Sequence, residues 1–214
     1  MRRAPAALVA LVAAGVLLTG CDSVAPALAC KVDVDSPDLV KDREAAGISD
    51  CVTEFDDAAP ASDLPDLDLD CLGGTTSRSL AEVRGPALIN FWASNCGPCR
   101  KELPVLQEFH EKYGDQVSVL GVDYLETYPG AAIDLARQSG VTYPSLADAC
   151  GDLQETDLVI QGLPQFVFVA ADGSTQQSAG GIDSVAELVA LVQQHLGIDV
   201  TPRTPDDTAQ EGAR

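Results

Sequence analysis

The sequence predicts an α/β domain with a central mixed β-sheet and helices on both faces. Two observations support this prediction. From about residue 64 onward, apolar segments of strand length alternate with segments of helical periodicity. Near the end, the Asp172-Gly173 dipeptide joins two strand-like segments directly, which is typical of an antiparallel hairpin in the same sheet.

The elements follow one another in a regular order. Leu67, Leu69 and Cys71 alternate with aspartates, and Gly73-Gly74 then turns the chain, which predicts an N-terminal β-hairpin. The later predicted elements are a strand at 87–93, a helix ending at Gly114, a strand at 117–122, an inserted helix at 131–139, strands at 166–171 and 174–179, and a helix from Ser184 to Gly197.

The chain is strongly acidic, with 13 Lys+Arg against 33 Asp+Glu and a net charge of -20. This charge excludes nucleic acid as a partner, because Lys and Arg supply the affinity for phosphate. The acid is concentrated before the sheet, so we interpret residues 21–63 as a solvated spacer containing one short helix that starts after Ser36. Residues 64–197 form the domain, and 198–214 are predicted to be a disordered tail.

The N-terminus has the features of a secretory signal. Arg2 and Arg3 precede an apolar stretch, and Leu18-Thr19-Gly20-Cys21 resembles a bacterial lipobox. We therefore expect residues 1–20 to be a signal peptide and Cys21 to carry a lipid, which would anchor the protein to the cell membrane on its extracytoplasmic side. An uncleaved membrane helix is the alternative.

The pair Cys96-Gly97-Pro98-Cys99 lies where a buried strand ends and a helix begins. The helix N-terminus stabilises a thiolate there, so Cys96 is predicted to be the nucleophile and Cys99 the resolving thiol. A zinc half-site and a static disulfide are the alternatives. Zinc would need a second ligand pair, and the sequence has no other C-x-x-C motif.

The stretch from Phe91 to Cys99 resembles the active-site segment of the thioredoxin family. Pro104 matches the family's helix-kinking proline, and Gly162-Leu163-Pro164 matches its cis-proline loop. The resemblance implies a thioredoxin fold. It also implies a substrate-binding surface, made of Trp92, Gly97, Pro98, Leu163 and Pro164.

Between about Leu64 and Gly197 the chain is similar, more narrowly, to the TlpA/ResA-like extracytoplasmic thioredoxins. In that group the position of Glu102 is a carboxylate that tunes the cysteines. Two positions differ from thioredoxin: Asn90 replaces a buried Asp, and Asn95 replaces a Trp. Because Asn90 does not titrate, proton handling is left to Glu102, water or the substrate thiol.

Four further cysteines, Cys30, Cys51, Cys71 and Cys150, are expected to form structural disulfides outside the cytoplasm. Three connectivities exist, and we favour Cys51–Cys71 with Cys30–Cys150 because the first would dock the acidic segment on the leading strand. The competing interpretation gives one or two of these thiols a part in electron relay.

The resemblance implies a thiol–disulfide oxidoreductase that needs no cofactor or metal. Reduction of extracytoplasmic protein disulfides is the favoured direction, because Gly97-Pro98 is the dipeptide of reducing thioredoxin. Cytochrome c maturation is one use of such reductants, and a membrane thiol protein would supply the electrons. The alternatives are a copper-binding carrier of related fold and a peroxidase.

Overall fold

The structure is a computed structural model that describes residues 30–51 and 60–203. The predicted signal peptide and the predicted lipid-bearing Cys21 lie outside the described residues. By its internal contacts the chain divides into two units, Met1–Cys30 and Lys31–Arg214, and every strand and helix of the described residues belongs to the second unit. None of the helices in the described segments is long and apolar enough to span a bilayer.

The second unit contains one mixed sheet of seven strands, in the order β2-β1-β5-β4-β3-β6-β7. The central strand β3 pairs in parallel with β4 and antiparallel with β6. All six residues of β3 are buried, as its apolar sequence predicts. The strands are β1 (Asp68–Cys71), β2 (Ser77–Ser79), β3 (Ala87–Trp92), β4 (Ser118–Tyr124), β5 (Ser145–Asp148), β6 (Gln165–Val169) and β7 (Thr175–Ala179).

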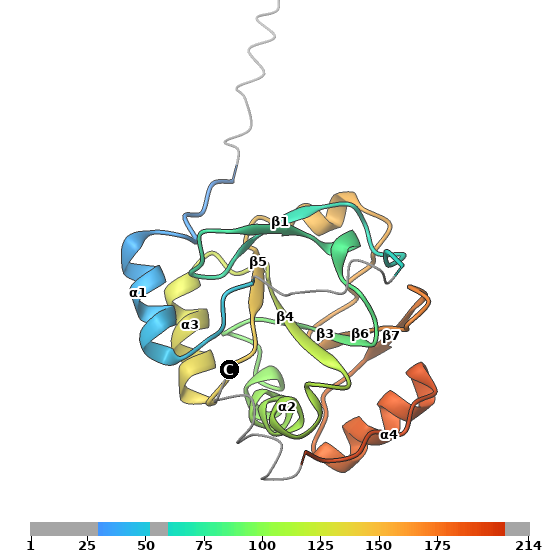
Figure 1. Ribbon diagram of the computed structural model, residues 1–214. Helices are drawn as coiled ribbons and strands as arrows, with labels where there is room; N and C mark the ends of the chain where they lie inside the picture. Colours follow the sequence, from blue (N-terminus) through green and yellow to red (C-terminus); the bar gives the residue numbers. More distant parts are fainter. Residues whose placement is uncertain (1–29, 52–59, 204–214) are drawn as a thin grey trace, which may run out of the picture. The chain divides into compact units, whose positions relative to one another are not determined.

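The α-helices of the domain are α1 (Pro37–Ala46), α2 (Cys99–Tyr113), α3 (Pro129–Gln138) and α4 (Val185–Leu196). Figure 1 shows how these helices are arranged around the sheet. The buried apolar side chains of α2, α3 and α4 all join one core cluster with Leu88 and Phe168. The opposite face of the sheet carries Ile89 and Val167 and is covered by loops and two short 3-10 helices, η1 (Leu80–Glu82) and η2 (Asp152–Glu155).

This arrangement confirms the predicted α/β fold and corrects one detail of it. We expected helices on both faces, but the α-helices that follow β3 and β4 lie on the same face. The chain moves from β3 to β4 to β5 in a single direction across the sheet. Crossovers between parallel strands are right-handed as a rule. Two such crossovers in succession put their helices, α2 and α3, on one side.

The sequence analysis did not predict strand β5. Its four residues, Ser145 to Asp148, include two polar side chains and follow directly after Pro144, so they carry no alternating pattern. They form a strand because both neighbours are present, with β4 on one side and β1 on the other. The tertiary context therefore decides this element.

The interpretation of the acidic segment as a spacer is wrong for residues 31–51. Helix α1 forms between Ser36 and Gly47, as predicted, and Gly47 after its last turn is in the left-handed conformation. The segment packs on the domain through Val34 and Ile48. Arg43, although charged, is buried because its guanidinium donates to the backbone carbonyls of Gly73 and Ile48 at 2.9 and 2.8 Å.

The start of the predicted tail is also ordered against the domain. Thr201 exchanges hydrogen bonds with the side chain of Gln116, and the Arg203 N–H donates to the Lys112 carbonyl at 2.8 Å. Ile198 and Val200 pack on the core. The disordered tail therefore stays a prediction only for residues 204–214, which lie outside the described residues.

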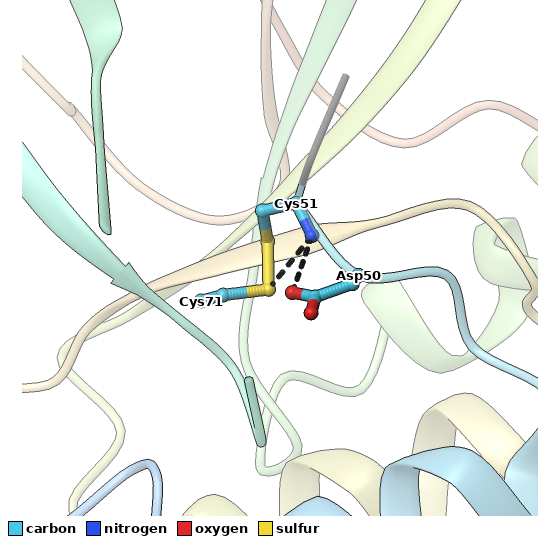
Figure 2. A group of neighbouring side chains, drawn as sticks. All are labelled: Asp50, Cys51 and Cys71. Carbon is cyan, nitrogen blue, oxygen red and sulfur yellow. Dashed lines mark hydrogen bonds between the residues drawn. A yellow bond between two sulfur atoms is a disulfide. The ribbon is translucent and has the colours of Figure 1, made fainter. Parts of the chain in front are cut away.

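A disulfide joins Cys51 to Cys71 and ties the N-terminal segment to strand β1 (Figure 2). Both cysteines are buried, and the Asp50 carboxylate lies beside them, accepting from the Cys51 N–H at 2.8 Å. This is the pairing that we favoured from the sequence. Cys30 and Cys150 are disulfide-bonded as well, and their mutual pairing stays a prediction.

Removing this disulfide is expected to destabilise the domain. The double variant Cys51→Ala/Cys71→Ala should lose about 3 kcal/mol of unfolding free energy, because the bond closes a loop with a sequence separation of 20 residues. Urea unfolding measures the loss, with Cys96 and Cys99 replaced by alanine in both proteins to prevent thiol exchange. A loss below ~0.5 kcal/mol, the usual range of a neutral surface change, would contradict a stabilising role.

Candidate functional site

The Cys96–Cys99 pair lies at the junction between β3 and α2. Strand β3 ends at Trp92, a short turn follows, and α2 begins at Cys99. The two cysteines form a disulfide with a Cα–Cα distance of 5.3 Å. The Cys99 N–H donates to the sulfur of Cys96 at 3.2 Å, so the first backbone donor of the helix already points at that atom.

The two sulfurs differ in their access to solvent. Cys96 is partly exposed, whereas the side chain of Cys99 is fully buried. Gly97 and Pro98 between them are exposed, and a Cβ on Gly97 would meet no atom within 4 Å. An external disulfide can therefore approach Cys96 but not Cys99, which agrees with the predicted order of nucleophile and resolving thiol.

Glu102 lies one helical turn after Cys99, on the same side of α2, and its side chain is fully buried. Asn90, on β3, donates a hydrogen bond from Nδ2 to the Oε1 atom of Glu102 at 2.9 Å. The residue that replaces the thioredoxin Asp is therefore in direct contact with the predicted carboxylate. The non-titrating amide of Asn90 holds the carboxyl group that stands in for the missing Asp.

Burial raises the pKa of Glu102 to about 8, and the hydrogen bond from Asn90 together with the backbone of Ile182 limits the rise. A thiol has an ordinary pKa of about 8.5, so proton exchange between Glu102 and a neighbouring thiol costs little free energy. Tyr143, also fully buried, has its pKa raised by burial and by the charge of Glu102. Glu102 is thus suited to hold a proton at neutral pH.

The cis-proline loop and the loop before α4 complete the surface around Cys96. The peptide bond between Leu163 and Pro164 is cis, as the resemblance implied, and Pro164 is buried next to half-buried Leu163. A Cβ on Gly181 would lie 3.9 Å from each of three atoms, Pro98 Cβ, Pro164 Cγ and Glu102 Oε2. The absence of a side chain at residue 181 therefore keeps the space between the two prolines open.

Gly181 was missed by the sequence analysis, although it follows another glycine at the end of a predicted strand. Changing Gly181 to Val is expected to lower the turnover of a protein disulfide about tenfold, since filling this space costs ~1–3 kcal/mol of substrate contact. Reduction of insulin tests this, with a small aromatic disulfide as the control substrate that should be affected less. Equal losses for both substrates would show that residue 181 does not border the substrate surface.

Trp92 does not belong to the substrate surface. We expected it among the substrate-binding residues, but its side chain is fully buried in the core beneath the active-site turn. Its Nε1 atom faces Gly121 on the neighbouring strand, where a Cβ would approach it to 2.9 Å. Trp92 alternates with Phe91 along β3 and lies on the same face as Asn90 and Leu88, where α2 packs against the sheet and covers it.

In the described part of the chain, one group of three side chains could hold a metal ion, namely Asp50, Cys51 and Cys71. Its two sulfurs are joined in the disulfide of Figure 2, which removes both thiolates as ligands. His110 instead packs its ring against Tyr143 and His195 stacks on Phe168, so neither histidine completes a site with Cys96. The structure gives no support to the copper-carrier alternative.

A cavity of about 420 Å³ lies on the loop-covered face, and no residue of the dithiol site lines it. Three carboxylates, Asp63, Glu155 and Asp157, form part of its wall together with uncharged residues. Its lining among the described residues includes neither a cysteine nor a histidine. We therefore place the chemistry at the Cys96–Cys99 junction.

A dithiol at the N-terminus of a helix, next to a cis-proline loop and above a mixed sheet, defines a protein of the thioredoxin-like class. A family model described as the AhpC/TSA family matches residues 56–177, more than half of the chain. The protein belongs to this family. The family match covers the sheet from β1 into β7 and includes both cysteines of the pair.

Relatives with known names agree with this assignment. Thioredoxin-like protein YneN of Bacillus subtilis is 34% identical over 41% of this chain, and the match spans about half (52%) of its own length. The thiol:disulfide interchange protein DsbE of Pseudomonas fluorescens is 33% identical, over 60% of this chain and 73% of its own. ResA of Bacillus cereus is 31% identical, over 51% and 63%. These names confirm the resemblance to ResA-like proteins.

Solved structures confirm the fold. The structure of MTB dsbF in its mixed oxidized and reduced forms superposes with a TM-score of 0.53 and 26% identity, covering 60% of this chain and 94% of that one. A thioredoxin-like protein from Porphyromonas gingivalis gives a TM-score of 0.52 at 26% identity, covering 63% and 92%.

Proposed function

We propose that this protein is a thiol–disulfide oxidoreductase that reduces disulfides of other proteins through Cys96 and Cys99. The observation that carries the proposal is the asymmetric pair itself, with a partly exposed Cys96 sulfur at the start of α2 and a buried Cys99 behind it. The relatives named as thiol–disulfide oxidoreductases support the same activity.

The proposed reaction begins with the pair reduced. The Cys96 thiolate attacks one sulfur of the substrate disulfide, so a Cys96–substrate bond forms while the substrate S–S bond breaks, and the released thiolate takes up a proton. Cys99 then loses its proton and attacks the Cys96 sulfur, which restores the Cys96–Cys99 disulfide and releases the second substrate thiolate. Two electrons have moved to the substrate, and an external dithiol must supply the next two.

Glu102 serves as the proton-exchanging group in this proposal. It is buried one turn from Cys99, and its raised pKa of about 8 places its proton affinity close to that of a thiol. At neutral pH the carboxyl group is mostly protonated, and its minor ionised fraction can take the proton of Cys99 as this sulfur becomes a nucleophile. Asn90 orients the carboxyl group for that exchange through the hydrogen bond to Oε1.

We further propose that the protein works outside the cytoplasm, held at the cell membrane by a lipid on Cys21. The signal-like residues 1–20 and the additional cysteine pair favour this location. Membrane fractionation of the wild type and a Cys21→Ala variant tests the anchor. Release of the variant into the soluble fraction is expected, and equal membrane retention of both proteins would contradict it.

Apocytochrome c is the proposed substrate class, with a membrane thiol protein as the electron donor. Haem attachment requires free thiols in a Cys-x-x-Cys-His sequence. The reduced protein should therefore reduce an oxidised Cys-x-x-Cys-His peptide at least as fast as a scrambled peptide with the same disulfide. A clear preference for the scrambled peptide would exclude this use.

Reduction of insulin with dithiothreitol as donor tests the activity itself. The wild type is expected to accelerate precipitation of the insulin B chain above the rate with dithiothreitol alone. The Cys51→Ala/Cys71→Ala variant, assayed below its melting temperature, should retain that rate because the Cys51–Cys71 disulfide is buried. No acceleration by the wild type would overturn the proposed function.

A further inference from the structure

Ser94, two residues before Cys96, has each of its polar groups engaged in a hydrogen bond. Its N–H donates to the Oε2 atom of Glu126 at 3.0 Å, and its hydroxyl donates to the same oxygen. Arg100, in the first turn of α2, donates from Nε to the Ser94 carbonyl at 2.8 Å. The turn that precedes Cys96 is therefore fixed by hydrogen bonds to two side chains, Glu126 and Arg100.

Glu126 comes from a different part of the chain, the loop that follows β4. Its side chain is 3% exposed, and its second oxygen, Oε1, accepts from the Tyr128 N–H at 3.3 Å. Both carboxylate oxygens thus accept hydrogen bonds, as an ionised carboxylate does. Burying a charge in this way costs free energy, which the hydrogen bonds from Ser94 and Tyr128 offset in part.

A second acid lies close to Glu126. Asp123, at the end of β4, is fully buried and pairs in register with Trp92 of β3. Burial and, to a smaller extent, the charge of Glu126 raise the pKa of Asp123 well above its usual value. Arg100 is the cation that contacts the Ser94 turn. The hydrogen bonds from Ser94 and Tyr128 give the Glu126 carboxylate the partners that a buried charge needs.

We propose that Glu126 is a positioning residue of the dithiol site, which fixes the Ser94 turn and places a buried negative charge beside this turn, two residues before Cys96. A negative charge at this place disfavours the Cys96 thiolate. A less stable thiolate makes the dithiol a stronger reductant, because oxidants of this class owe their potential to a stabilised reduced form. Glu126 and Glu102 therefore have separate roles: Glu126 acts on Cys96 through the turn, and Glu102 acts on Cys99 through α2.

This inference rests on Cys96 and Cys99 being the working pair. Its test compares Glu126→Gln with the wild type and with Glu155→Gln, which removes one exposed carboxylate that lies in η2, outside the dithiol site. Gln keeps the shape of the side chain and an acceptor for Ser94. In equilibrium with glutathione, the ratio of dithiol to disulfide at Cys96 and Cys99 is expected to be about tenfold higher in Glu126→Gln than in the wild type. This equals a rise of about 30 mV in the reduction potential. Alkylation of Cys96 should also start at lower pH.

Ser94→Ala tests the positioning itself and does not depend on the folding of the Glu126 variant. It removes the hydroxyl and leaves the charge, so we expect insulin turnover to fall several-fold with a potential near that of the wild type. An unchanged potential and alkylation profile in Glu126→Gln, or unchanged turnover in Ser94→Ala, would overturn the inference. Failure of the wild type to reduce insulin would instead refute the function on which it rests.

Discussion

Replacing Cys99 by serine is expected to give a protein that attacks substrate disulfides and stays bound to them. Cys96 is the partly exposed sulfur and keeps the donated N–H of residue 99, so its attack on the substrate remains intact. The serine hydroxyl cannot displace the substrate from Cys96. Insulin turnover should fall to the rate with dithiothreitol alone, while a mixed disulfide accumulates and appears in non-reducing gel electrophoresis.

Cys96→Ser is the matched control for this result. It should lose turnover to the same extent but form no mixed disulfide, because the remaining thiol of Cys99 is fully buried. The difference between the two variants therefore measures the assignment of roles. Trapping by Cys96→Ser and not by Cys99→Ser would reverse the roles, and full turnover in either variant would exclude a dithiol mechanism.

Glu102→Gln is expected to remove a pH-dependent loss of stability. Glu102 has a pKa of about 8 in the folded protein against an ordinary value of 4.5. Below pH 4.5 it is protonated in both states, so it costs nothing. As the pH rises toward 8, the unfolded chain releases the proton and the folded protein keeps it, so the wild type loses stability relative to the variant. The loss is complete above about 8 and amounts to at most about 5 kcal/mol.

Urea unfolding at a series of pH values measures this difference. Glu108→Gln is the control, because Glu108 is exposed on the same helix and pairs with Lys112. The Glu102→Gln variant should also shift the alkylation profile of the reduced cysteines. Parallel stability curves for the wild type and Glu102→Gln between pH 4.5 and 8 would show that the carboxyl group is not held protonated, and an unchanged alkylation profile would remove it from the mechanism.

Local sequence signals predicted the parts of the site that lie close together in the chain. The pair Cys96 and Cys99 is marked by its spacing at a strand–helix junction, and Glu102 is placed by the helical repeat one turn later. From the sequence we expected that Glu102 could carry protons in place of the Asp that Asn90 replaces. We did not expect the side chains of Asn90 and Glu102 to be hydrogen-bonded to each other. This hydrogen bond depends on how β3 and α2 pack against each other, which cannot be derived from a single sequence.

The features that the sequence did not predict depend on contacts between distant segments. Glu126 lies 32 residues from Ser94, and neither belongs to a recognisable motif, so their bonds appear only in the folded chain. Strand β5 forms because β4 and β1 offer open edges on either side. The composition of the acidic segment indicates a spacer. In the folded chain, however, Arg43 binds the carbonyl of Gly73 and so attaches this segment to the domain.

The reduction potential of the Cys96–Cys99 pair tests the central claim most directly. The protein is equilibrated with glutathione buffers of increasing ratio, and the fraction of the pair in the dithiol form is counted by alkylation and mass spectrometry. A reductant with a buried Glu102 and with Glu126 bound to the turn before Cys96 is expected to have a potential near that of thioredoxin, about -270 mV. A value near about -120 mV, that of a strong oxidant, would contradict the account and reverse the direction of electron flow.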